Sequence, residues 1–131
     1  MILDDQTFAA MVWAAYEEMP PRFKDELENL EILIEATPNP TQMNNANAKG
    51  CLLGLFEGVP KTAWGQATMG VQPSKITLFR EPILTMCANN GQLKNKIKEV
   101  LMHEIAHYFG YNEQEVRALD SKFRKKTGQS Q

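Results

Sequence analysis

Two histidines are the residues of this chain best suited to metal chemistry, and both fall in the segment HEIAHYFGYNE, from His103 to Glu113. Residues four apart lie on the same face of a helix, so His103 and His107 can present two imidazole nitrogens to one metal ion. Glu104 follows the first histidine in an HExxH arrangement, in which two histidines bind zinc and the glutamate acts on the zinc's water. The alternative is two surface histidines that make unrelated hydrogen bonds.

A catalytic zinc takes three protein ligands and leaves a fourth position for water, so a third ligand is required. Glu113 lies six residues past His107 and just beyond Gly110, where the chain can turn off the helix and return toward both imidazoles. We therefore expect Glu113 to be the third ligand. The alternatives are Glu115, Asp120 and a site completed by water. Glu115 and Asp120 rank below Glu113, because either acid would need the last helix to fold back toward the histidines.

Two imidazoles and a carboxylate are a donor set that suits one Zn²⁺ per chain, although iron(II) uses a similar triad. Zinc bound in this way acts as a Lewis acid and lowers the pKa of its water to about 7. Glu104 would take the water's proton during attack on a carbonyl and pass it to the leaving amine. Tyr108 and Tyr111 are candidates to donate a hydrogen bond to the oxyanion of the tetrahedral intermediate. Tyrosines in such positions are more often partly buried core residues.

Patterns of apolar residues predict the elements that must position this motif. The expected helices cover residues 7–19 (capped by Asp5 or Thr7), 21–29, 93–109 and 114–123, with a helical turn or two at 82–88, and the expected strands cover 30–35, 51–56 and 75–80. The residue types at Asn89 to Gly91 favour a turn. Those at 37–49 and 58–74 favour loops, and the second loop contains Trp64, which is large and apolar enough to be buried. The fold class is therefore α+β, a small sheet flanked by helices.

Composition bounds the remaining possibilities. Hydrophobic residues at 43% and charged residues at 23% are ordinary for a globular protein, and the net charge of -2 gives no indication of a nucleic-acid partner. We expect one domain over residues 1–120 and a solvated basic tail over 121–131, with an anionic docking patch as the alternative for the tail. A monomer is the default.

Cysteine usage and the N-terminus indicate a cytoplasmic protein. Cys51 and Cys87 belong to no CxxC pair, so reduced thiols are expected, with a nucleophile or metal ligand as the minor alternative. The N-terminal MILDDQTF is acidic where a secretory signal would be basic, and no apolar run approaches membrane-spanning length. We therefore expect no membrane partner.

The chain resembles the minimal metalloprotease-like, or zincin-like, family of small bacterial predicted zinc peptidases. The resemblance runs from about Phe8 to Asp120 and is most specific in VLMHEIAHYFGYNEQEVRAL, with support from the order of MPPRF, ENLEILIEATP, LLGLFEGVPKT and PSKITLFREPI. It implies a compact zincin-like domain with HExxH on a long helix, a bound zinc, and peptidase activity on an unidentified peptide or protein.

Two departures from related patterns matter. The family usually has an aspartate where this chain has Glu113, and the extra methylene moves the carboxylate. Metzincins share the HExxHxxG spacing, but they place a methionine turn downstream, and no methionine follows Met102 in this chain. The substrate-cleft anatomy of metzincins is therefore not expected here.

Two other functions remain open at this point. One is a non-hydrolytic zinc-binding or regulatory protein with the same fold, and the other is a peptidase that cuts a single partner protein and ignores generic peptides. A further hypothesis concerns the strand at 75–80. If it lies at the sheet edge beside the metal, an extended peptide can pair with it by strand addition.

Overall fold

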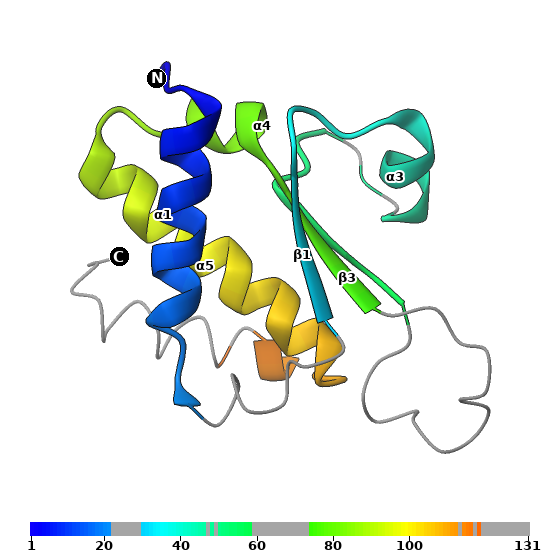
Figure 1. Ribbon diagram of the computed structural model, residues 1–131. Coiled ribbons are helices and arrows are strands. Elements are labelled where there is room, and N and C mark those ends of the chain that lie inside the picture. Colours follow the sequence, from blue (N-terminus) through cyan, green and yellow to red (C-terminus); the bar gives the residue numbers. More distant parts are fainter. Residues whose placement is uncertain are drawn as a thin grey trace.

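The structure is a computed structural model of the 131-residue chain, and it describes residues 1–21, 30–46, 48, 50–58, 74–112, 114–116 and 118. A three-stranded mixed sheet packs against helices, which confirms the expected α+β class. Helices α1 and α5 lie on one side of the sheet and α3 lies beside the other (Figure 1). Helix α5 contacts β2 and β3, and α1 packs on α5.

The sheet has the strand order β1-β3-β2, in which β1 is Leu30–Glu35, β2 is Gly54–Glu57 and β3 is Ser74–Phe79. Strand β3 pairs with β1 in parallel and with β2 antiparallel, so that Ile76 lies opposite both Ile32 and Phe56. The three expected strands are confirmed, with β2 shifted toward Glu57.

The hypothesis that the strand at 75–80 forms a sheet edge is wrong, because β3 is the central strand. Ile76 and Leu78 enter the core beneath α5, and Thr77 and Phe79 on the opposite face are buried as well. A strand paired on both sides has no free backbone groups for a peptide. Within the part of the chain that the structure describes, the edge that faces the histidines belongs to β2.

Helix α1 covers Asp5–Glu17, close to the expected 7–19, and buries Phe8, Val12 and Ala15. Its cap is Asp4 rather than Asp5 or Thr7: the Asp4 carboxylate accepts a 2.7 Å hydrogen bond from the Thr7 backbone N–H. This bond also lowers the pKa of Asp4, because it favours the charged carboxylate.

The stretch at 37–49 is not simply a loop, since it contains the short helix α3, Pro40–Asn45. Its capping box joins Asn39 and Gln42: the Asn39 side chain accepts from the Gln42 N–H at 2.7 Å, and the Gln42 side chain accepts from the Asn39 N–H at 2.9 Å. Pro40 occupies the first turn, where its missing N–H costs nothing. The Gln42 amide also donates to Glu35 at 3.1 Å, which fastens α3 to the end of β1.

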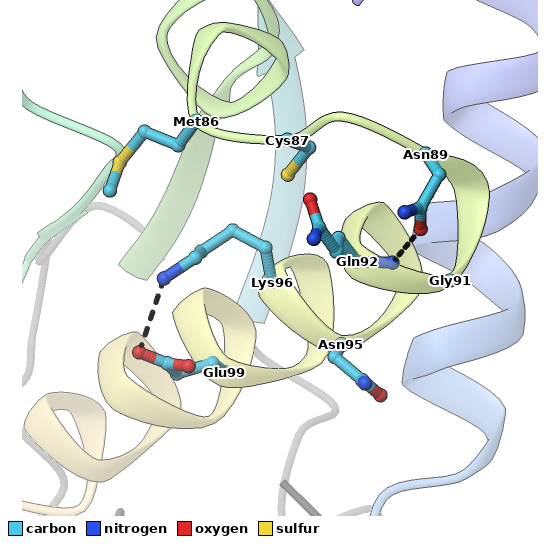
Figure 2. A pocket seen from close by; sticks show the side chains of 8 residues that line it. All are labelled: Met86, Cys87, Asn89, Gly91, Gln92, Asn95, Lys96 and Glu99. Atoms are coloured by element: carbon cyan, nitrogen blue, oxygen red, sulfur yellow. Dashed lines mark hydrogen bonds and ion pairs between the residues drawn. The ribbon is translucent and has the colours of Figure 1, made fainter. Parts of the chain in front are cut away.

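Helix α4, Arg80–Thr85, leads to α5, Asn90–Tyr108, the 19-residue helix that carries the motif. The expected turn at Asn89 to Gly91 is in fact the start of α5, because the Asn89 side chain caps it by accepting a 2.9 Å hydrogen bond from the Gln92 N–H (Figure 2). The fully buried residues of α5 repeat at helical spacing and hold it on the sheet and α1: Leu93, Ile97, Leu101, Ile105 and Tyr108.

An ion pair fastens α1 to α5 at the edge of the core. The Lys98 ammonium donates to the Glu18 carboxylate, and the Lys94 ammonium lies 3.9 Å from the other oxygen of the same carboxylate. Lys98 is itself nearly buried, with a side chain 11% exposed.

Several expectations fall wholly or partly outside the described residues: the helix at 21–29 apart from Pro21, nearly all of the loop at 58–74 with Trp64, and the domain end at 120 with its basic tail. The last helix is described only at Gln114 to Val116 and at Ala118, all helical as expected. Cys51 is exposed, Cys87 is buried, and both are free thiols. In the described ranges, each helix is too short or too polar to span a membrane.

Candidate metal centre

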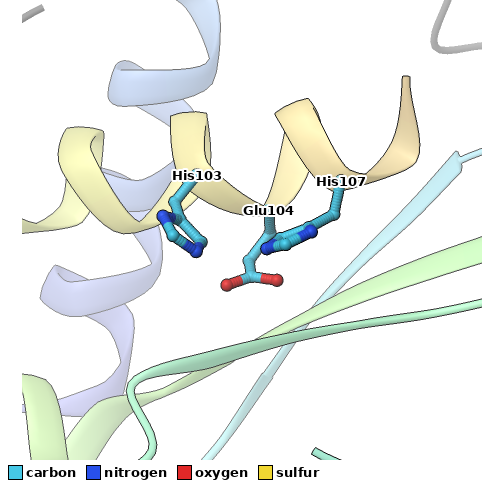
Figure 3. A group of neighbouring side chains, drawn as sticks. All are labelled: His103, Glu104 and His107. Carbon is cyan, nitrogen blue, oxygen red and sulfur yellow. The ribbon is translucent and has the colours of Figure 1, made fainter. Parts of the chain in front are cut away.

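The structure brings His103, Glu104 and His107 together on one side of α5. One possible ligand atom from each lies within 4.8 Å of the others, and the imidazole ring centroids are 4.8 Å apart at an interplanar angle of 64°. Figure 3 shows the three side chains projecting from the helix toward the sheet. Both imidazoles are half-buried and Glu104 is buried, so the three residues form a candidate metal site.

The C-terminal part of α5 is firmly anchored, which fixes the direction of these side chains. Ile105 and Tyr108 are fully buried, and Met102 packs in the core as expected. The Tyr108 ring meets Phe56 of β2 edge-on at 5.9 Å. Burial raises the pKa of Tyr108, because the phenolate is costly away from water. Tyr108 is thus part of the hydrophobic core, the commoner of the two roles considered for it.

The helix ends directly after the second histidine. Gly110 has a φ of 82°, which a residue with a side chain rarely adopts. Its N–H donates to the His107 carbonyl at 2.9 Å, and the Tyr111 N–H donates to the Ala106 carbonyl at 3.1 Å. These bonds satisfy the last carbonyls of α5 and turn the chain away from the helix axis. The expected helix end near Phe109 is confirmed.

The candidates for the third ligand are Glu113, Glu115 and Asp120. Glu113 and Asp120 both lie outside the described residues. Glu115 is exposed, and its carboxylate accepts a 2.9 Å hydrogen bond from the Asn112 N–H. The Glu115 N–H donates in return to the Asn112 side chain at 2.8 Å. This reciprocal capping box gives the Glu115 carboxylate a structural role next to Asn112.

A cavity of about 540 Å³ opens beside the three side chains. Helix α5 and its C-terminal turn form one wall, and the strand β2 with the residues before it forms the other. Its lining residues are His103, Glu104, His107, Gly110 and Tyr111 on the helix side, Leu52, Gly54, Leu55 and Phe56 on the strand side, and Ala46 after α3. Sequence reasoning expected a strand at 51–56, but not that it would face the histidines.

The donor set fits zinc. Two half-buried imidazoles stand beside a buried carboxylate, with possible ligand atoms no more than 4.8 Å apart. Zinc–nitrogen bonds are about 2.0–2.1 Å long, so the two imidazole nitrogens that share one ion must lie within about 4.2 Å of each other. Among the described residues, this is the only group of three or more side chains that could hold a metal ion.

A second cavity, of about 570 Å³, lies at the opposite end of α5, where α4 leads into it (Figure 2). Its lining includes three side-chain amides, the Lys96–Glu99 ion pair at 3.5 Å, and Cys87. Burial raises the pKa of the Cys87 thiol, the opposite of what an activated nucleophile requires. The minor alternative for Cys87, a nucleophile or third ligand, therefore gains no support.

Comparisons with known proteins agree with this geometry. The chain has the fold of a conserved hypothetical protein from T. thermophilus, with a TM-score of 0.54 at 21% identity, over 91% of this chain and 99% of the other. No curated protein matches the chain. A family model described as zincin-like metallopeptidase matches residues 27–123, which include the whole of α5. The chain therefore belongs to the zincin-like metallopeptidase family.

Proposed function

We propose that this protein is a zinc-dependent metallopeptidase that hydrolyses peptide bonds. The supporting observation is the convergence of His103, Glu104 and His107 at the wall of an open cavity, in a chain of the zincin-like family. His103 and His107 would hold one zinc ion, with Glu113 as the third ligand. When bound, zinc would polarise a substrate carbonyl and lower the pKa of a water molecule.

Glu104 is the residue that we propose to move the proton. Its carboxylate lies beside both imidazoles, and the residue is only 8% exposed. A general base must lie within hydrogen-bond reach of the proton that it takes, and the place of Glu104 beside both imidazoles supports this role toward a water molecule bound at the site. Glu104 would take a proton from that water and deliver it to the nitrogen of the leaving amine.

The outer edge of β2 is the place where we propose that the substrate binds. Strand β2 pairs with β3 on one side, and its residues Gly54 and Phe56 line the cavity. An extended peptide could pair with the other side by strand addition, with its carbonyls facing the metal site. This replaces the earlier hypothesis of pairing along the strand at 75–80, which has no free edge.

The roles of Glu104 and the histidines can be separated by mutation. Glu104→Gln should keep its zinc and lose turnover by about 100- to 10,000-fold, the usual contribution of a general base. His103→Ala and His107→Ala should lose both zinc and turnover. Glu81→Gln is the control, because Glu81 lies on α4, outside the helix that carries the motif, and pairs with Arg80 at 3.1 Å.

Zinc content and hydrolysis of a mixed peptide library are the two measurements required. Undiminished hydrolysis by zinc-loaded Glu104→Gln would remove Glu104 from the proposed role. Wild-type protein that binds zinc and cleaves no peptide in the library would favour the non-hydrolytic zinc-binding alternative. A comparison of protein levels in cells that carry wild type or Glu104→Gln would then detect a peptidase with a single partner.

A further inference from the structure

Gly54 is a residue of the edge strand β2 that lies close to Glu104. A Cβ atom added at Gly54 would lie 2.7 Å from Val100 Cγ1 and 3.3 Å from Glu104 Cγ. The strand residue opposite Gly54 in the sheet is Leu78, whose side chain belongs to the core. Gly54 and Leu78 are therefore the first residue pair between β2 and β3, and both lie on the face of the sheet that α5 covers.

The backbone conformation does not explain this glycine, because Gly54 is not among the residues with positive φ. Space explains it. Gly50, by contrast, has a φ of 146° and no atom within 4 Å of an added Cβ, and Gly91 would meet only the Asn89 side chain, at 3.3 Å. Of these three glycines, Gly54 alone is constrained by contact with the proposed site.

The neighbours of Gly54 have little freedom to move aside. Val100 is 7% exposed, and a β-branched side chain in a helix has one strongly preferred rotamer. Favourable carbon–carbon contacts begin near 3.5 Å, so a methyl group at 54 would have to separate β2 and α5 by about 0.8 Å at Val100. Glu104, four residues further along α5, lies on the same face and would be displaced as well.

We infer that Gly54 is a positioning residue for the active site: its lack of a side chain lets β2 lie against α5 and sets the place of Glu104 relative to the strand edge. This inference rests on the proposed function. Catalytic groups must be held within about 0.5 Å of their productive positions, and an error of about 1 Å can cost about 100-fold in rate. Neither imidazole is among the three nearest contacts of an added Cβ, so zinc binding should be spared.

Three variants test this inference: Gly54→Ala, Val100→Ala and the double variant. Gly54→Ala should retain one zinc per chain, melt at a lower temperature and lose about 10- to 100-fold in kcat. Val100→Ala should melt at a lower temperature with kcat close to that of the wild type. The double variant removes the contact at 2.7 Å but keeps the one at 3.3 Å with Glu104, so its melting temperature should rise above that of Gly54→Ala while kcat stays low.

Recovery of kcat together with the melting temperature in the double variant would overturn the inference, because Gly54 would then serve only the packing of β2 on α5. Wild-type kcat in Gly54→Ala would overturn it as well. Crystal structures of wild type and the double variant give a result that does not depend on activity. The Glu104 carboxylate should shift relative to the imidazoles by several tenths of an ångström, and an unmoved carboxylate would contradict the inference.

The structural measurement also separates this inference from the proposed function. If the wild type cleaves no peptide but Glu104 moves in the double variant, the proposed function fails and the positioning role of Gly54 stands. If the wild type cleaves peptides and the double variant has wild-type kcat and an unmoved Glu104, the proposed function stands and the inference fails.

Discussion

Replacement of the two partners of the α1–α5 ion pair should have unequal effects on stability. The Glu18 side chain is 47% exposed, whereas the Lys98 side chain is only 11% exposed. Glu18→Gln removes the charge that compensates a nearly buried ammonium. Lys98→Met instead replaces that ammonium with an unbranched apolar chain of similar length, and it leaves a carboxylate that water can solvate.

The expected magnitudes follow from these exposures. Breaking a buried pair costs about 3–5 kcal/mol and breaking an exposed one about 0.2–1 kcal/mol. Because water screens the half-exposed carboxylate, we expect Glu18→Gln to reduce the free energy of unfolding by about 1–2 kcal/mol, or the melting temperature by about 4–8 °C. Lys98→Met should lie within about 0.5 kcal/mol of the wild type.

The same pair predicts a pH dependence. The pKa of Glu18 lies below its ordinary value of 4.5, chiefly because its carboxylate accepts the hydrogen bond from Lys98. A carboxyl group whose pKa is lower in the folded than in the unfolded state contributes stability above its unfolded pKa, and this contribution disappears as the pH falls through the folded value. The stability difference between wild type and Glu18→Gln should therefore be present at neutral pH and close in acid, below 4.5.

Urea denaturation of the variants over this pH range is the assay. Lys94→Met is the matched control, because the Lys94 side chain is 57% exposed and its ammonium lies 3.9 Å from the same carboxylate. This substitution should change the free energy of unfolding by less than about 0.5 kcal/mol. The reasoning is refuted if Lys98→Met is as destabilising as Glu18→Gln, or if the difference between wild type and Glu18→Gln persists in acid.

Three further predictions concern the helix end, the thiols and the third ligand. Gly110→Ala should lower the free energy of unfolding by about 1 kcal/mol, since its φ of 82° disfavours a side chain; unchanged urea denaturation would contradict this. A thiol reagent should modify Cys51 in the folded protein and Cys87 only after unfolding, because Cys87 is 6% exposed and burial raises the pKa of its thiol. Mass spectrometry measures the labelling of each cysteine, and equal labelling of both in the folded protein would contradict this prediction. Glu113→Gln should weaken zinc binding at least about 10-fold and Glu115→Gln should not, as measured by competition with a chelator; the reverse order would exchange their roles.

The parts of the site that depend on local spacing were predictable from the sequence. Helical periodicity placed His103, Glu104 and His107 on one side of a helix, and Gly110 marked its end. Both features arise within a few residues of chain, so no knowledge of the tertiary structure was required.

Features that depend on distant partners were not predictable. Alternating apolar residues identified β3 as a strand, but its central place follows from pairing with both β1 and β2. The burial of Thr77 and Phe79 depends on that pairing and on the layers that cover each face. The special space around Gly54 arises because Val100 and Glu104, about fifty residues away in the sequence, pack against it.

Two capping boxes have recognisable spacing in the sequence, but the neighbouring residues favoured other predictions. Asn39 and Gln42 lie among prolines and asparagines that favour a loop, yet their reciprocal hydrogen bonds begin α3. Asn112 and Glu115 form the same motif after α5. Recognition of the second box from its spacing would have predicted the structural role of the Glu115 carboxylate.

A crystal structure of the zinc-loaded protein tests the central claim most directly. We expect one zinc ion bonded to nitrogens of His103 and His107 at about 2.0–2.1 Å and to a carboxylate oxygen of Glu113, with Glu104 beside the fourth position and not bonded to the metal. Zinc bound elsewhere, a protein that stays metal-free with zinc in excess, or imidazoles that point apart would contradict the account.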